Sequence, residues 1–268
     1  MVKIGWLHDD LGMVGGSELS ERTLREGAPE WADIVLCAPN KRPPEDIEAF
    51  ILQNCATYPR KWKEVLEGKP VVKHCRDSWW AGSITLRRWI LDNAALLLFS
   101  SKMQEETYEH AHDSTKSAIV PPPVNLDWFR DAAQPADQRQ GAVWVGRADP
   151  GKGLHLSCDW AWREGEPLDI YGDMNIKYLD VRKFGGLITY HGKVPYEALP
   201  GIYGRARIFH FTPIHIEPFA RTVVEAWAAG CELIVSGRVG ALEWIRDRPD
   251  DIGRGVEMFW QEVERVLQ

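Results

Sequence analysis

The sequence predicts an α/β fold of two doubly wound domains, each with a parallel sheet between layers of helices. Short apolar runs alternate with helix-like segments along the whole chain, which is the pattern of repeated strand–helix–strand units. The runs are continuously apolar, as strands buried on both faces should be. Residues 121–141, rich in Pro, Asp and Gln, separate two sets of five candidate strands.

The candidate strands follow one another regularly on both sides of this break. In the first half they are residues 2–8, 32–38, 70–74, 95–100 and 117–121. In the second half they are residues 141–146, 168–172, 187–192, 206–211 and 231–236. We expect Rossmann-like domains over 1–124 and 125–255, and a C-terminal helix over 256–268 that crosses back to the first domain. Ligands of such sheets bind at the carboxyl ends of the strands, so we expect the site in a cleft between the domains.

Composition excludes several classes of protein. The chain has 268 residues, 44% of them apolar, and a net charge of −7. The halves on either side of Val124 carry −3 and −4, so we expect no nucleic-acid partner, because phosphate neutralisation needs a positive face. Residues 1–8 are predicted to form a strand rather than a secretory leader. No run approaches the roughly 18 apolar residues of a membrane-spanning helix.

Cysteine and histidine spacing does not indicate a metal site. The five cysteines lie far apart and form no C-x-x-C pair. We therefore expect reduced thiols in a cytoplasmic protein and no zinc site. His110 and His112 lie two positions apart on a predicted helix, so they point in different directions and make a poor metal pair.

A glycine-rich loop follows the first candidate strand. Gly12, Gly15 and Gly16 allow a tight turn and a close approach of the backbone to a ligand. Ser17 can cap the next helix, whose free N–H groups favour an anion. The spacing is neither G-x-G-x-x-G nor a Walker loop. A purely structural turn between strand and helix is the alternative interpretation.

A second glycine-containing loop opens the second half. The strand ends at Val145, Gly146 allows a turn, and Arg147 and Lys152 follow before the next helix. Two cations beside a helix N-terminus suit a diphosphate. The alternative is an ordinary surface pair on a polar loop.

Two glutamates lie eight positions apart where a strand passes into a helix. Glu217 is expected in the loop at the carboxyl edge of the sheet, and Glu225 about two turns along the next helix. At ~1.5 Å per residue they lie on the order of 10 Å apart, which is too far for an acid/base pair on one bond. That spacing suits two hydroxyl-bearing parts of one long ligand, such as a nucleotide sugar. The alternative is two unrelated, solvated glutamates.

These three stretches together resemble the retaining glycosyltransferases of family 4, which have the GT-B fold. Gly15, Gly16 and Glu18 match the family's Gly-Gly-x-Glu loop. Arg147, Lys152 and Gly153 match its Gly-Arg and Lys-Gly pairs, and Glu217, Glu225 and "EAWAAG" match its two-glutamate motif. The resemblance covers most of the chain and is strongest over 142–245.

The resemblance implies a role for each matching residue. Arg147 and Lys152 would hold the donor diphosphate, Glu225 the ribose hydroxyls, and Glu217 the transferred sugar. His74, at the end of a strand, aligns with a family histidine near the reacting sugar, and a buried structural histidine is the alternative. The remaining donor-binding positions are Gly15, Gly16, Glu18, Gly146, Phe219, Ala220 and Arg221.

The implied chemistry is transfer of a sugar with retention of configuration. Negative charge builds on the leaving diphosphate through an oxocarbenium-like state, and fixed cations stabilise it. We assign no protein nucleophile and expect front-side attack, with the donor phosphate deprotonating the acceptor. No Asp-x-Asp triplet follows a strand, so we expect no metal and no cofactor. The partners are a nucleotide-sugar donor and a glycan, lipid-linked or small-molecule acceptor.

The sequence also departs from the family pattern. Ala220 stands where the family has Gly, and Arg221 follows it. "PPPVN", residues 121–125, replaces Asn-Gly before the linker, and the first domain is short, with about five strands. These changes bear on the choice of sugar and acceptor.

Basic and aromatic residues are interleaved in the first domain. Residues 58–69 contain Tyr58 and Trp62 among Arg and Lys, and residues 79–90 add further tryptophans and arginines. Such a surface suits weak peripheral contact with an anionic membrane, or stacking on sugars. Ordinary helix faces are the alternative.

Three rival functions remain open from the sequence. A nucleotide-sugar epimerase would act without an acceptor, and a phosphorylase would need free phosphate or a bound cofactor. A non-catalytic nucleotide-sugar-binding or partner subunit would bind the donor and release no nucleotide.

Overall fold

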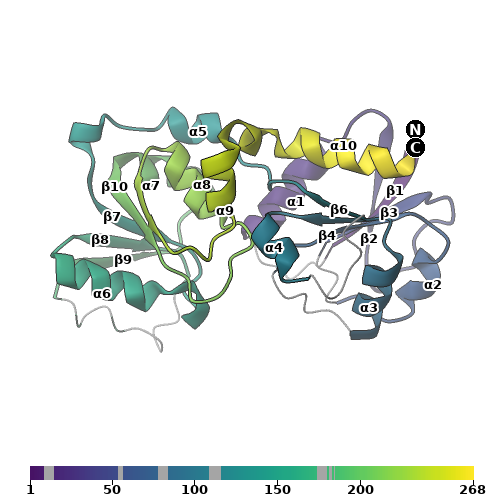
Figure 1. Ribbon diagram of the computed structural model, residues 1–268, viewed down its shortest axis with the longest axis horizontal. Helices are drawn as coiled ribbons and strands as arrows, with labels where there is room; N and C mark the ends of the chain where they lie inside the picture. The colour runs from purple at the N-terminus through teal and green to yellow at the C-terminus, as the bar shows by residue number, and fades with distance from the viewer. Residues whose placement is uncertain are drawn as a thin grey trace. The chain divides into compact units, whose positions relative to one another are not determined.

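The protein consists of two compact α/β units, each built on a parallel sheet (Figure 1). The computed structural model describes residues 1–8, 15–53, 57–77, 84–108, 116–173, 180, 183 and 185–268. Unit 1 comprises Met1–Pro123 and Arg246–Gln268, and unit 2 comprises Val124–Ile245. The predicted pair of doubly wound domains is confirmed.

Unit 1 contains a six-stranded sheet in the order β2-β1-β3-β4-β5-β6. All five strand pairs are parallel. The strands are β1 (Val2–Leu7), β2 (Ala32–Cys37), β3 (Ala49–Leu52), β4 (Val71–His74), β5 (Leu96–Phe99) and β6 (Ser117–Ile119). The prediction of about five strands was wrong because β3 was missed. That strand has only four residues, all of them buried.

Helices cover both faces of this sheet, as Figure 1 shows. One core packs side chains of α2 (Trp62–Leu66) and α3 (Ile84–Asn93) against the sheet. The other packs α1 (Gly16–Glu26) and α10 (Gly255–Leu267) against the opposite face. The short helix α4 (Lys102–Glu106) follows β5. Strands buried on both faces explain why the runs in the sequence are continuously apolar.

The last helix, α10, belongs to unit 1, and the chain returns to that unit at Arg246, after unit 2. Phe259 and Trp260 enter the core beside Trp6, and the Trp260 indole N–H donates to the carbonyl of Leu24 at 2.9 Å. Figure 1 shows α10 running beside α1.

Unit 2 ends at Ile245, whereas the second domain was expected to run to residue 255. Pro249–Arg254 form a 3-10 helix (η6) that leads into α10 and buries Ile252 completely. A Cβ on Gly255 would lie 2.4 Å from the carbonyl oxygen of Pro121, so this stretch packs tightly against the end of unit 1's first segment.

Unit 2 contains a five-stranded parallel sheet in the order β11-β10-β7-β8-β9. Its strands are β7 (Gln140–Val145), β8 (Leu168–Tyr171), β9 (Ile188–Gly192), β10 (Ala206–Phe211) and β11 (Glu232–Val235). The helices are α5 (Leu126–Arg130), α6 (Leu154–Glu164), α7 (Leu199–Arg205), α8 (Arg221–Ala228) and α9 (Ala241–Asp247). Short 3-10 turns η2 (Ala136–Gln138), η3 (Pro150–Lys152) and η5 (Tyr196–Ala198) complete it.

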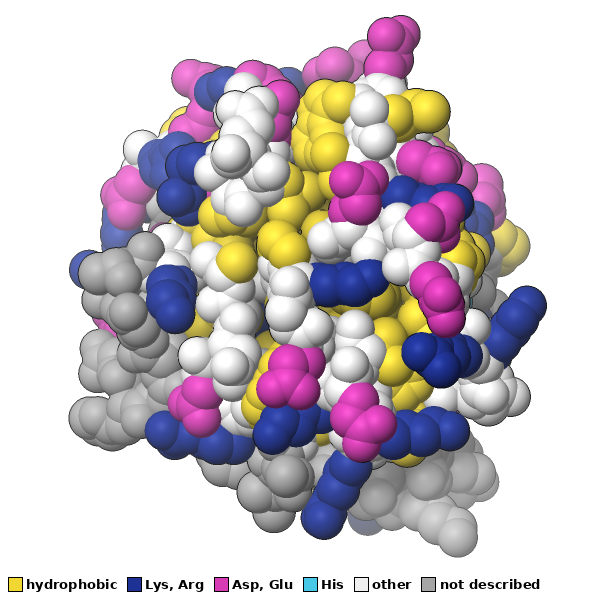
Figure 2. All heavy atoms as spheres, turned by 90° about the vertical axis from the view of Figure 1, so that its right-hand side faces the viewer, with side chains coloured by type: hydrophobic (Ala, Val, Ile, Leu, Met, Phe, Trp, Pro, Cys, Tyr) yellow, Lys and Arg dark blue, Asp and Glu magenta, His cyan; other side chains and the backbone are white. Residues whose placement is uncertain are grey.

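The aromatic residues proposed for membrane contact are partly core residues. Tyr58 and Trp62 are each 2% exposed and pack edge to face with 5.0 Å between ring centroids. Residues 79 and 80 lie outside the described residues. Over the face in Figure 2, basic side chains are interspersed with acidic ones rather than gathered in one patch. Among the described helices, none combines the length and apolarity needed to cross a membrane.

The cysteine thiols that the structure describes are all buried. They are Cys37, Cys75, Cys158 and Cys231. Burial raises the pKa of the Cys37 thiol to about 11, and that of Cys158 to about 12. Because the thiolate is the reactive form, these positions are unreactive packing residues.

Candidate functional site

Three loops at the carboxyl edge of unit 2's sheet are joined through their backbones. The N–H of Ile214, in the loop after β10, donates to the Gly151 carbonyl at 2.8 Å. Farther along that loop, the N–H of Glu217 donates to the carbonyl of Arg238 at 2.8 Å, and Gly240 donates back to Glu217 at 2.9 Å. Glu217 therefore forms a parallel bridge with Val239, and its side chain starts from a fixed backbone position.

Close contact between the first two loops requires glycine. Gly153 has a φ of +68°, and a Cβ there would lie 2.0 Å from the carbonyl oxygen of Thr212. A Cβ on Gly151 would lie 2.2 Å from the ring of His215. The glycines that the sequence analysis noted around Lys152 thus allow the loop after β7 to approach the loop after β10.

The structure brings Lys152 and Glu217 together. Lys152 Nζ lies 2.6 Å from Glu217 Oε2, and the two side chains are 29% and 14% exposed. Asp149 accepts hydrogen bonds from the N–H groups of Gly151 and Lys152 at 3.0 and 3.2 Å, which shapes the η3 turn. Arg147 lies in the same loop, with its Nε 3.8 Å from an Asp149 oxygen and its side chain 65% exposed. Lys152 is therefore held against the Glu217 carboxylate, whereas Arg147 is largely exposed to solvent.

Glu225 is buried on α8, with 2% exposure. The Tyr196 hydroxyl donates to its Oε1 at 2.9 Å, and Arg221, one turn earlier, lies 3.4 Å from the same oxygen. Arg221 also donates to the Tyr196 hydroxyl at 2.8 Å. Burial raises the pKa of Glu225, and the Arg221 charge opposes that shift. The cation and the hydroxyl donor oppose the effect of burial, but the pKa of Glu225 stays raised.

Tyr203 completes the surroundings of Glu225. Its hydroxyl is buried, and within the described part of the chain it has no hydrogen-bond partner of normal geometry. Burial, followed by the nearby Glu225 charge, raises the pKa of the Tyr203 hydroxyl well above its usual value.

The loop between Glu217 and α8 has an unusual backbone. Ala220 caps the helix with φ 60° and ψ 80°, and among the described residues it is the only non-glycine with a positive φ. Phe219 before it is buried, and its carbonyl accepts from the N–H of Ala241 at 3.1 Å. The left-handed geometry explains why glycine suits this position in the family that the chain resembles.

The predicted donor-loop residues of unit 1 form the start of α1. The Gly15 N–H donates to Glu18 Oε2 at 2.9 Å, so the Glu18 carboxylate occupies one of the free N–H groups at the helix start. Gly16 is the first residue of the helix. The prediction that Ser17 caps it was wrong, because Ser17 lies within the first turn. Gly12 lies outside the described residues.

His74 lies at the end of β4 and is 1% exposed. Its Nδ1 lies 3.5 Å from the Gln53 amide, and its ring centroid lies 5.3 Å from that of Phe259. Burial, with the Arg76 and Lys73 charges, holds the pKa of His74 well below its usual value, so the ring is neutral. Its Nε2 is buried and has no hydrogen-bond partner among the described residues. His74 belongs to unit 1, and Arg147, Lys152 and Glu217 belong to unit 2.

The sequence analysis did not assign a role to Tyr196 or Asp149. Both lie in loops that follow strands of unit 2's sheet, where ligands of such folds bind. Their position after a strand was the one feature of the sequence that could have indicated a role in the site. The side-chain directions that bring Tyr196 to Glu225 required the structure.

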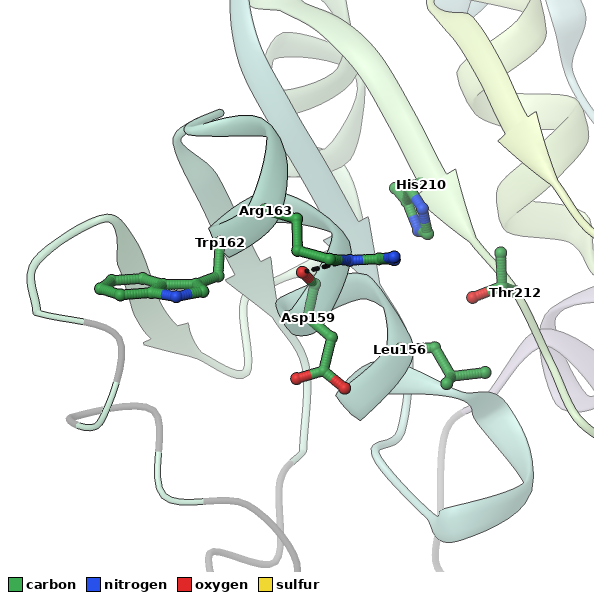
Figure 3. A pocket seen from close by; sticks show the side chains of 6 residues that line it. All are labelled: Leu156, Asp159, Trp162, Arg163, His210 and Thr212. Atoms are coloured by element: carbon green, nitrogen blue, oxygen red, sulfur yellow. Dashed lines mark hydrogen bonds between the residues drawn. The ribbon is translucent and has the colours of Figure 1, made fainter.

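A shallow pocket lies on the α6 side of β10 (Figure 3). It contains none of the predicted donor residues. His210 stacks on Trp160 at 4.4 Å and its Nδ1 lies 2.9 Å from the Ser157 hydroxyl. Burial lowers the pKa of His210 to about 4. Figure 3 shows Trp162 directed away from His210. The residues lining the pocket are Leu156, Asp159, Trp162, Arg163, His210 and Thr212.

Comparison with solved structures identifies the fold as GT-B. HepE of Anabaena, solved with UDP and glucose, is 14% identical with a TM-score of 0.71, over 100% of this chain and 92% of that one. Sucrose-phosphate synthase of Thermosynechococcus elongatus is 16% identical with a TM-score of 0.71, over the same shares. WaaG, a glycosyltransferase involved in lipopolysaccharide biosynthesis, is 12% identical with a TM-score of 0.64, over 98% and 90%.

Comparisons by sequence found no such likeness. No model of a known protein family matches the sequence, and a search of curated proteins found none similar to it. The predicted GT-B fold is confirmed by structure alone.

We predict that Ala220→Gly stabilises the protein by roughly 0.5–1 kcal/mol. Relief of the left-handed strain on alanine, about 1–2 kcal/mol, exceeds the added entropy of glycine in the unfolded chain. Ala228→Gly, within α8, is the matched control and should destabilise by about 1 kcal/mol. Urea unfolding of both variants checks this, and equal destabilisation by the two substitutions would contradict the backbone assignment.

We predict that His210 makes the fold sensitive to mild acid. Its folded-state pKa of about 4 lies below the usual 6.5, so the unfolded chain binds the proton first as the pH falls. The free energy of unfolding should therefore drop between pH 6.5 and pH 4, by about 3 kcal/mol from this group. Unfolding at several pH values should show a shallower dependence in His210→Asn than in the wild type. An unchanged slope would show that His210 is not buried in its neutral form.

Proposed function

We propose that the protein is a glycosyltransferase that moves a sugar from a nucleoside diphosphate sugar to an acceptor hydroxyl. The observation that carries this proposal is the pairing of Lys152 with Glu217, held by three joined loops at the carboxyl edge of unit 2's sheet. Ligands of doubly wound sheets bind at that edge. HepE, similar in fold, was solved with UDP and with UDP-glucose, which supports a nucleotide-sugar donor here.

Each residue of the site has a proposed role. Arg147 and Lys152 bind the donor diphosphate as charge-assisted donors. The carboxylate of Glu217 accepts hydrogen bonds from the transferred sugar, and that of Glu225 accepts them from the ribose. Phe219 and Ala220 set the conformation of the loop that lies beside the transferred sugar. These are the roles that the resemblance to family 4 implies, and the contacts within unit 2 are compatible with them.

We propose transfer with retention and without a metal ion. The bond from the anomeric carbon to the diphosphate oxygen breaks, and the acceptor oxygen bonds to that carbon from the same face. The acceptor proton passes to the departing phosphate oxygen. Arg147 and Lys152 stabilise the charge that grows on the diphosphate. This role is most effective if Lys152 turns from Glu217 toward the diphosphate as the charge develops.

Unit 1 is proposed to bind the acceptor. His74 is the residue assigned to the reacting sugar, and its buried, neutral ring with an unpartnered Nε2 among the described residues offers one polar atom for that role. A cytoplasmic location, in which buried thiols stay reduced, is also proposed. Weak peripheral membrane contact through unit 1 stays a prediction, without a contribution from the buried Tyr58 and Trp62.

The proposal is tested by thermal unfolding with UDP, GDP, ADP and TDP. A nucleotide at 100 times its dissociation constant stabilises the folded state by about 2.7 kcal/mol. For Lys152→Met we expect about 1 kcal/mol or less at the same concentration, because a lost hydrogen bond to a charged group costs roughly 1.5–3 kcal/mol of binding. Lys61→Met, an exposed lysine of unit 1, is the control and should respond like the wild type.

Three outcomes of this experiment differ in meaning. Stabilisation of the wild type that is reduced in Lys152→Met supports the site. Stabilisation that is equal in both proteins places the nucleotide elsewhere. Absence of stabilisation by all four nucleotides contradicts the nucleotide-binding assignment.

A further inference from the structure

The contacts of Glu225 fall on one oxygen of its carboxylate. The Tyr196 hydroxyl and Arg221 Nε both approach Oε1, at 2.9 and 3.4 Å. The Tyr203 hydroxyl also lies near this carboxylate without a hydrogen bond of normal geometry, and among the described residues no hydrogen bond of normal geometry reaches Oε2. A carboxylate can accept about four hydrogen bonds over its two oxygens, so Glu225 retains accepting capacity on the Oε2 side.

Tyr196 and Arg221 are themselves fixed in place. Arg221 donates to the Tyr196 hydroxyl at 2.8 Å, and its guanidinium lies 5.6 Å from the centre of the Tyr196 ring. That ring also packs against α5, with its centroid 5.4 Å from that of Trp128 and 6.3 Å from that of Phe129. The phenol therefore reaches Glu225 from a position set by aromatic packing.

This arrangement orients the carboxylate plane. Two donors on Oε1, one from η5 and one from the start of α8, restrict rotation of the Glu225 head group. The side chain is 2% exposed, so a ligand hydroxyl that reaches Oε2 meets little competition from water, which strengthens the hydrogen bond.

We propose that Tyr196 and Arg221 are positioning residues that orient Glu225 toward the ribose hydroxyls, and so give the site its preference for ribonucleotides over deoxyribonucleotides. This inference rests on the proposed function, in which Glu225 binds the ribose. Tyr196 and Arg221 act through the glutamate, and the ribose of the nucleotide is the ligand part that they select.

The test is isothermal titration calorimetry with UDP, GDP and ADP, each paired with its 2′,3′-dideoxy analogue. For the pair that binds, the affinity of the wild type for the ribonucleotide should be roughly tenfold to a hundredfold higher than for the dideoxy analogue. A hydrogen bond to a charged group usually contributes this much to binding. In Tyr196→Phe we expect that ratio to fall at least fivefold, with the affinity for the dideoxy analogue unchanged. Arg221→Lys keeps the charge but loses the planar fork, and should lower the ratio to a smaller extent.

Tyr190→Phe is the matched control. It removes another phenol of unit 2, whose hydroxyl donates to the Gly172 carbonyl at 3.0 Å, and should keep the wild-type ratio. Equal weakening of both analogues in Tyr196→Phe, which leaves the ratio unchanged, would mean a structural role and overturn the inference. A larger ratio would mean that Tyr196 blocks the carboxylate, which also overturns it.

The outcome for the wild type separates this inference from the proposed function. If the wild type binds no nucleotide, the proposed function fails. If it binds a nucleotide without ribose preference, the assignment of Glu225 fails. If it prefers the ribonucleotide and Tyr196→Phe keeps that preference, only the positioning role is overturned.

Discussion

The candidate site depends on the backbone hydrogen bonds that hold Glu217 between two neighbouring loops. Its N–H and carbonyl are used by Arg238 and Gly240, and Ile214 in the same loop is held by Gly151. Loops at a sheet edge are ordinarily the most variable and mobile parts of a fold. Here the bridge to Val239 extends sheet-like order past the strand ends. With both loops fixed in this way, Lys152 Nζ lies 2.6 Å from Glu217 Oε2.

Charge within the site is balanced locally. Lys152 lies against Glu217, and Arg221 lies against Glu225. A buried charge without a partner would cost several kcal/mol. Each of these pairs avoids that cost, because the acid and the cation neutralise each other where solvent access is limited. Arg147 is the more exposed cation. In the proposed function, the anionic donor binds to Arg147, which is already exposed, and to Lys152, which gives up its contact with the Glu217 carboxylate for one with the phosphate.

Much of the fold could be predicted from the sequence, because strands buried on both faces leave continuous apolar runs. The strand β3, with four buried residues, was not predicted. Unit 2 ends before η6, which carries a polar sequence around one buried isoleucine, whereas the second domain was expected to include it. Lys152, Glu217 and Glu225 could be singled out from spacing and resemblance. Tyr196 could not, because its role depends on a contact across 29 positions of sequence. The capping role of Glu18 was missed because a motif match does not show which hydrogen bonds a carboxylate already makes.

The most direct measurement of the central claim is a crystal structure of the protein with bound UDP. The account predicts the diphosphate within hydrogen-bond distance of Lys152 Nζ, beside Arg147, with the ribose hydroxyls on Glu225 Oε2. A nucleotide bound at a different place, with the Lys152–Glu217 pair intact and Glu225 without a ligand contact, would contradict it.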